Sequence, residues 1–443
     1  MKALLDRLHA KLGDFWWYSL MLFCACRAAD LINAFVGLWI VPMYVDPKEL
    51  GALLPLCQFA NLLALPAAIF AATFRNELTT LAVNREFGKV RTLMRGVFVA
   101  SAIFLLIALL LTRLVLPHFL TRIRIAEGSL GWIILASAFI SCIAPLYNNA
   151  IQSLKKFSSF SIINLLGAPI RLIAMVLAMP LRPITGYFVG QASTPVFSIM
   201  ASLFCLRKGL RGKAEPYWNI AVIKRFSRLF ALLAIGALSG TFLTLVETTV
   251  LRQRLCDMDS AGYYIATRFS EIAGYVATTL TFTLFPFTAE LAAKRQDARP
   301  ILLKAGAAIV VTNLLLIVAF LLFGNCLIRI LPHGEQYVTY SWSVLWMIAI
   351  TTLTALTNLY TTAECSANRF GYFKWLIPLT LLYPILLLIT TGNGYFTNIL
   401  PVPLMNFIRA INVTSLRSML WWMTAFGLVR LFCVLFAMTR KTR

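Results

Sequence analysis

Histidine, acidic side chains and paired cysteines are all scarce in this sequence. Three His and 17 Asp and Glu stand against 40 Lys and Arg. The nine Cys are scattered singly, apart from Cys24 and Cys26, and the sequence contains no CxxC motif and no Cys/His cluster. Because zinc sites and disulfide frameworks need such clusters, we expect no metal site. The cysteines are expected to be small apolar core residues.

Charged residues of either sign are also rare, at 13% of the chain, whereas hydrophobic residues make up 60% and the mean hydropathy is +0.80. Apolar runs of about 20 residues, the length that crosses a bilayer as a helix, recur along the whole chain. In lipid the backbone must satisfy its own hydrogen bonds, and barrel strands would alternate over about ten residues. The sequence therefore predicts an all-α polytopic membrane protein.

Short loops separate the apolar runs, so they leave no room for a soluble catalytic domain. Residues 1–14 carry Leu at helical spacing with basic residues between, which predicts an interfacial amphipathic helix. The longest loop, 392–417, includes an apolar run that is expected to lie in the membrane interface. Twelve membrane segments are predicted, at approximately 16–42, 50–73, 96–116, 130–152, 159–181, 184–206, 226–250, 262–291, 301–323, 341–364, 372–391 and 418–438.

The positive charge is concentrated in one set of loops. The regions on the side of the N-terminus carry 26 Lys and Arg, and the regions on the opposite side carry 10. Because Lys and Arg favour cytoplasmic loops, both termini are predicted to be cytoplasmic. This arrangement accounts for the net charge of +23 without a nucleic-acid partner.

A repeat links the two halves of the chain. Gly51 opens the second segment and Gly262 opens the eighth, and each segment runs out through a Glu-Leu pair, at Glu77 and Glu290, into a basic stretch. An even number of helices per repeat gives both halves the same orientation in the membrane. The sequence predicts two six-helix bundles in a parallel repeat, residues 1–215 and 216–443, around a central cavity that takes the substrate.

Charged and polar side chains within the apolar segments are the candidates for lining that cavity, because a charge at membrane depth is costly. Arg268 and Glu271 lie on one helical stripe with two tyrosines, and an ion pair that only locks packing is the alternative reading for them. Inter-helix hydrogen bonding is the alternative for Gln58 and Asn61. The predicted cavity residues are Arg27, Asp30, Asn33, Gln58, Asn61, Arg171, Tyr264, Arg268, Glu271 and Tyr275.

The arginines of this set outnumber the acids, so the cavity is expected to prefer an anion. A guanidinium pairs with phosphate oxygens in a bidentate manner, and a low dielectric strengthens the contact. The acids can neutralise arginines when the site is empty, or they can bind a proton or a cation that drives transport. Asp30, Glu247 and Glu271 are the candidates for coupling.

The second and eighth segments resemble the polysaccharide transporter branch of the multidrug/oligosaccharidyl-lipid/polysaccharide exporter superfamily. In the eighth segment the resemblance lies in residues 261–266 and in Leu284-Phe285-Pro286, which lead into a basic stretch. In the second it runs from Leu50-Gly51 into residues 74–95. The repeat is imperfect, because Arg75 stands where the eighth segment has a proline.

This resemblance implies a flippase, not an enzyme, for oligosaccharide linked to undecaprenyl pyrophosphate, as in bacterial O-antigen, capsule or exopolysaccharide assembly. It implies a protein of the bacterial inner membrane that works by alternating access. We expect a monomer without a cofactor, with coupling to an H⁺ or Na⁺ gradient. Membrane lipids, a polysaccharide polymerase and glycosyltransferases are the implied partners. A multidrug and toxin exporter of the same superfamily is the alternative, but it would be expected to have an acid-dominated cavity. A membrane-embedded polymerase would need a larger outer loop.

Overall fold

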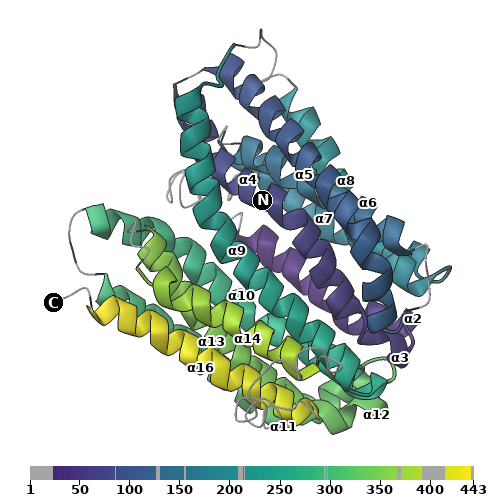
Figure 1. The fold of residues 1–443 in the computed structure, drawn as a ribbon. Helices are drawn as coiled ribbons and strands as arrows, with labels where there is room; N and C mark the ends of the chain where they lie inside the picture. The colour runs from purple at the N-terminus through teal and green to yellow at the C-terminus, as the bar shows by residue number, and fades with distance from the viewer. Residues whose placement is uncertain are drawn as a thin grey trace, which may run out of the picture. The chain divides into compact units, whose positions relative to one another are not determined.

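The computed structural model describes residues 23–84, 86–125, 130–153, 156–207, 213, 215–293, 296, 298–366, 371–391 and 415–440. Within these ranges the regular structure is helical and contains no strand (Figure 1). The interfacial helix predicted at 1–14 and most of the long loop 392–417 lie outside the described residues.

Each predicted membrane segment coincides with a helix. The first is described from residue 23, in the apolar stretch Phe23–Tyr44, which includes the π-helical turn Val36–Ile40 and α2 (Val41–Tyr44). The remaining helices are α3 (Pro47–Leu50), α4 (Leu53–Val83), α5 (Phe87–Arg122), α6 (Leu130–Ser153), α7 (Phe157–Ala178), α8 (Pro183–Leu206), α9 (Ile220–Arg254), α10 (Asp257–Ala293), α11 (Arg299–Ile330), α12 (Gly334–Tyr337), α13 (Ser341–Ser366), α14 (Phe373–Thr391) and α16 (Leu416–Arg440).

The helices have the length and apolarity that a membrane requires. In the described part of the chain, eight helical stretches can cross a bilayer by length and composition, among them Ser158–Ala178 and Arg299–Ile330. Many of their large apolar side chains are exposed, for example Leu177 and Leu322, as expected for surfaces that face lipid. The prediction of an all-α, multi-pass membrane protein is confirmed.

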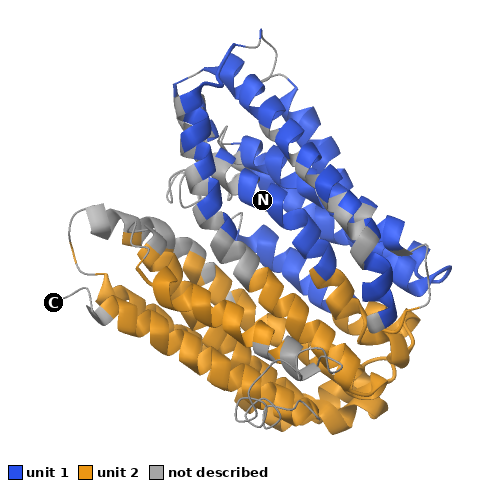
Figure 2. Ribbon diagram, viewed as in Figure 1, with its two compact units in different colours: residues 1–36, 59–121, 126–238 blue, residues 37–58, 122–125, 239–443 orange. Residues whose placement is uncertain are grey.

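The chain forms two compact units (Figure 2). Unit 1 consists of residues 1–36, 59–121 and 126–238, and unit 2 consists of residues 37–58, 122–125 and 239–443. The first two boundaries fall inside helical stretches, after Val36 and after Gln58. The division of the repeat near residue 215 stays a prediction.

Unit 1 is held together by an apolar core and by the close packing of α7 and α6 along α8. The core cluster brings together side chains of α4 to α9, including Phe74, Leu93, Ile163 and Phe226. Burial of an apolar side chain of this size contributes about 1.5–3 kcal/mol. This packing fixes α7 and α8, the two helices that carry most of the polar pocket described below.

In unit 2, α13 packs against α10, α11 and α16. A core cluster joins α10, α11 and α13, with Leu284, Ile309 and Leu359 among its members. Gly262, one of the two repeat glycines, lies in α10 directly against the ring of Tyr340. The Tyr340 hydroxyl donates a hydrogen bond of 2.8 Å to Asp259 Oδ1, which holds the ring in that place.

Gly262→Ala is expected to lower the free energy of unfolding by about 1–3 kcal/mol, because the added Cβ would overlap the Tyr340 ring. Gly240→Ala is the matched control. A Cβ at Gly240, also inside a helix of unit 2, meets no described atom within 4 Å. That change is expected to be neutral or to stabilise by up to about 1 kcal/mol. Thermal unfolding in detergent measures both variants, and equal shifts would contradict the packing argument.

Candidate functional site

Unit 1 contains a polar pocket of about 330 Å³. Side chains from three elements line it: the first membrane helix, α7 and α8. Each element presents one face to the pocket, because its lining residues are three or four positions apart. The lining residues are Cys26, Ala29, Asp30, Asn33, Asn164, Ala168, Arg171, Gln191, Thr194 and Pro195.

Arg171 is the cation of this pocket. Its Nη1 donates a hydrogen bond of 3.1 Å to Asn33 Oδ1, and its buried Nε has no hydrogen-bond partner. No carboxylate of the described residues lies within 4 Å of the guanidinium, whose five N–H groups can all donate. Arg171 is therefore only partly satisfied by the protein.

Asp30, the acid of the pocket, is neutralised from its own helix. Arg27 Nη2 lies 3.0 Å from Asp30 Oδ2, one helical turn away, and both side chains are about three-quarters buried. Arg27 itself is not among the lining residues, and its guanidinium lies 5.8 Å from the centre of the Phe23 ring. With Asp30 paired in this way, Arg171 gives the pocket a positive character.

Neutral polar groups complete the lining, and each already has one bond to the protein. Asn164 Nδ2 donates to the Phe160 carbonyl at 2.9 Å, and Gln191 Nε2 donates to the Tyr187 hydroxyl at 2.7 Å. The second N–H of each amide and both amide oxygens retain capacity for further bonds. The pocket can therefore surround an anion held by Arg171 with neutral donors.

In unit 2, the predicted stripe on α10 forms a connected group. Arg268 Nη1 donates to Glu271 Oε1 at 2.7 Å, and the Arg268 guanidinium lies 4.9 Å from the centre of the Tyr264 ring. Tyr264 is buried, and its hydroxyl donates to the Gly37 carbonyl at 3.2 Å. Gly37 also lies against the aliphatic part of Arg268. Arg268 is thus held by Glu271, by the Tyr264 ring and by Gly37, whereas Glu271 is about two-fifths exposed.

The other predicted residues are more dispersed. Gln58 Oε1 accepts a hydrogen bond of 3.4 Å from Thr244 of α9, which agrees with the inter-helix role considered for it. Asn61 is exposed on α4, and Tyr275 is half-buried on α10. Glu247 is buried in α9 with 6% of its surface exposed, and Arg430 of α16 interacts with it electrostatically.

Sequence reasoning missed three polar lining residues: Asn164, Gln191 and Thr194. A usable signal was present, since Asn164 lies two helical turns before Arg171 and therefore on the same face. Gln191 and Thr194 share a face of α8 at a spacing of three. Isolated neutral polar residues are common at packed helix interfaces, so this signal alone is weak.

No family model and no curated protein matches the sequence. Solved structures do match in fold. An inward-facing multidrug resistance MATE family transporter of the MOP superfamily has a TM-score of 0.69 and 14% identity, over 93% of this chain and 94% of that one. The lipid II flippase MurJ in an inward closed conformation has a TM-score of 0.63 and 12% identity, over 95% and 87%.

A MOP superfamily transporter from Pyrococcus furiosus, with a binding pocket described as reversed in polarity, also matches, with a TM-score of 0.63 and 14% identity. The match covers 95% of this chain and 94% of that chain. These three structures are described as transporters or a flippase, and each match extends over nearly the full length of the present chain. The chain has the fold of the MOP superfamily transporters.

Proposed function

We propose that this protein is a flippase for undecaprenyl-pyrophosphate-linked oligosaccharide, the repeat unit of an O-antigen, capsule or exopolysaccharide, in the bacterial inner membrane. The observation that carries the proposal is Arg171, a pocket guanidinium with one neutral partner and no carboxylate among the described residues. A half-buried guanidinium of this kind favours a phosphate-bearing substrate. The similarity of fold to a lipid II flippase supports a lipid-linked substrate.

In the pocket, one residue binds the charge of the substrate and neutral polar residues orient it. Arg171 binds the pyrophosphate, and Asn33, Asn164 and Gln191 donate or accept hydrogen bonds around it. The pairing of Asp30 with Arg27 keeps the carboxylate from repelling the substrate. In unit 2, Arg268 is the second site for phosphate, and Glu271 neutralises it while no substrate is bound.

Transport is proposed to proceed by alternating access, with both termini in the cytoplasm. Energy would come from an H⁺ or Na⁺ gradient through Asp30, Glu247 or Glu271, three acids that lie in membrane helices. The oligosaccharide would be supplied by glycosyltransferases and passed to a polysaccharide polymerase.

The second candidate function is a cation-coupled multidrug exporter, which the fold of the matched MATE transporter favours. Organic cations would need an available carboxylate. Asp30, the single carboxylate among the described residues that line the unit 1 pocket, is paired with Arg27, and Arg171 would repel a cationic drug. The charge of this pocket therefore favours the flippase over the exporter.

Expression in bacterial strains that lack their own oligosaccharide flippase separates the two candidates. We expect the protein to restore surface polysaccharide in at least one strain of a panel that differs in repeat-unit sugars. We expect no change in the accumulation of cationic drugs in a strain that lacks its drug exporters. Drug efflux without any restoration of polysaccharide would contradict the flippase and establish the exporter.

A further inference from the structure

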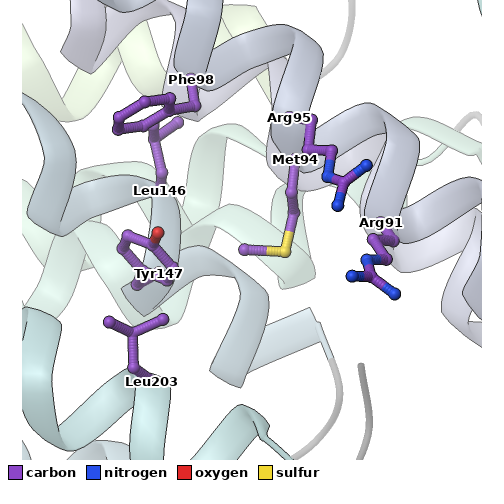
Figure 3. Close-up of a pocket in the computed structure, with 7 residues that line it drawn as sticks. All are labelled: Arg91, Met94, Arg95, Phe98, Leu146, Tyr147 and Leu203. Carbon is purple, nitrogen blue, oxygen red and sulfur yellow. The ribbon is translucent and has the colours of Figure 1, made fainter. Parts of the chain in front are cut away.

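A second pocket of unit 1, of about 310 Å³, lies near the start of α5 (Figure 3). It is separate from the pocket around Arg171, because the described linings of the two pockets have no residue in common. Side chains from α5, α6 and α8 line it: Arg91, Met94, Arg95, Phe98, Leu146, Tyr147 and Leu203.

The lining is divided into a basic end and an apolar end. Arg91 and Arg95 lie one helical turn apart on α5, so that their guanidinium groups point from the same face. Figure 3 shows both groups on one side of the pocket, while Phe98, Leu146 and Leu203 lie on the other side. A ligand that fills this pocket must therefore be anionic at one end and apolar at the other.

The apolar end continues along the outside of α5. Beyond Phe98, the helix exposes the large apolar side chains of Val99, Ile103, Leu106 and Leu110, the last with 69% of its surface exposed. From Phe98 to Leu110 the helix rises about 18 Å at 1.5 Å per residue. That length is close to half of the roughly 30 Å hydrocarbon core, so the stripe matches one leaflet of the bilayer.

The basic end lies where the sequence predicts the cytoplasmic surface. Two acids lie near the start of α5: Glu86 pairs with Lys89 at 3.1 Å, and the side chain of Glu215 packs against Gly88. The cytoplasmic leaflet carries anionic lipids whose surface potential attracts Lys and Arg. The charge of the pocket, its position and its apolar extension all fit the same class of ligand.

We propose that this pocket binds an anionic phospholipid of the surrounding bilayer. The phosphate lies between Arg91 and Arg95, and one acyl chain passes over Phe98 and along the exposed stripe of α5. The transported substrate fits this pocket less well, because among the described lining residues Tyr147 is the one polar group besides the two arginines that could bind sugar hydroxyls. The site does not depend on the proposed flippase function.

Native mass spectrometry of the full chain, released from mixed micelles of phosphatidylglycerol and phosphatidylcholine, tests this proposal. The wild-type protein is expected to retain phosphatidylglycerol selectively. Arg91→Gln combined with Arg95→Gln is expected to weaken that retention by roughly 30-fold, since each basic residue near an anionic surface contributes about a factor of five. Arg113→Gln, which changes an exposed arginine further along α5, is expected to leave retention unchanged.

Further variants separate the contribution of the charge from that of the acyl chain. The double variant Arg91→Lys, Arg95→Lys keeps the charge and is expected to retain the lipid, and unchanged thermal unfolding in phosphatidylcholine shows that each variant is folded. Phe98→Ser is expected to weaken binding of the intact lipid. Equal retention of both phospholipids, or full retention by the double Gln variant, would overturn the proposal. The proposal would also be overturned if inorganic phosphate alone stabilised the protein as well as the lipid does. The same holds if undecaprenyl phosphate, at an equal concentration, displaced phosphatidylglycerol from the protein.

Discussion

Substitution of Arg171 by Gln is expected to reduce transport of lipid-linked oligosaccharide by roughly 10- to 100-fold while the protein remains folded. A hydrogen bond to a charged group contributes about 1.5–3 kcal/mol, and Gln removes the charge while it can still donate to Asn33 Oδ1. The measurement is the rate of flipping of a fluorescent undecaprenyl-pyrophosphate oligosaccharide in proteoliposomes. Melting of the purified variant in detergent shows whether the fold survives.

Two further variants sharpen the interpretation of that result. Arg171→Lys keeps the charge but loses the planar, bidentate geometry, so an intermediate rate is expected. Arg182→Gln removes an exposed arginine of the same unit that lies outside the pocket, and it is expected to transport at the wild-type rate. Wild-type transport by Arg171→Gln would contradict the proposed role of the pocket.

The membrane helices could be predicted because a helix that crosses a bilayer needs a run of about 20 apolar residues, and such runs are visible in the sequence. The ends of these helices could not be predicted. The structure extends the segment predicted at 96–116 into the helix Phe87–Arg122, with charged residues such as Lys89 and Arg91 in its first turns. A helix can continue past the bilayer once its residues reach water, so hydropathy marks the membrane boundary and not the helix boundary.

The candidate site was predictable to the extent that it is charged. Arg171 and Asp30 stand out because placing an ionisable side chain in the membrane costs free energy, so such a residue usually has a function there. The partner of Arg171 is Asn33, which lies 138 residues away, and no local spacing connects them. Gln191 was missed because a neutral amide in a helix looks the same in sequence whether it packs against a neighbour or lines a pocket.

Arg252→Met is expected to lower the free energy of unfolding by about 3–5 kcal/mol. Arg252 is buried in unit 2, with 3% of its side chain exposed, and its guanidinium donates three hydrogen bonds. Nε bonds the Ile123 carbonyl at 3.2 Å, Nη2 bonds the Lys48 carbonyl at 3.0 Å, and Nη1 bonds Asp257 Oδ1 at 2.8 Å. Met fills a similar volume, but it leaves two backbone carbonyls without their donors, and each buried unpaired group costs about 1–3 kcal/mol.

Arg124 offers a matched control, because it bonds the same Asp257 oxygen at 3.0 Å but is about half exposed. An exposed ion pair contributes about 0–1 kcal/mol, so Arg124→Asn is expected to change stability by less than about 1 kcal/mol. Asn is chosen because Arg124 has a positive φ of +61°, a backbone conformation that Asn adopts more readily than most residues. Thermal unfolding of both variants in detergent decides the matter. If the two variants melt at the same temperature, the contribution of Arg252 comes from its ion pair and not from its three-point attachment to Lys48, Ile123 and Asp257.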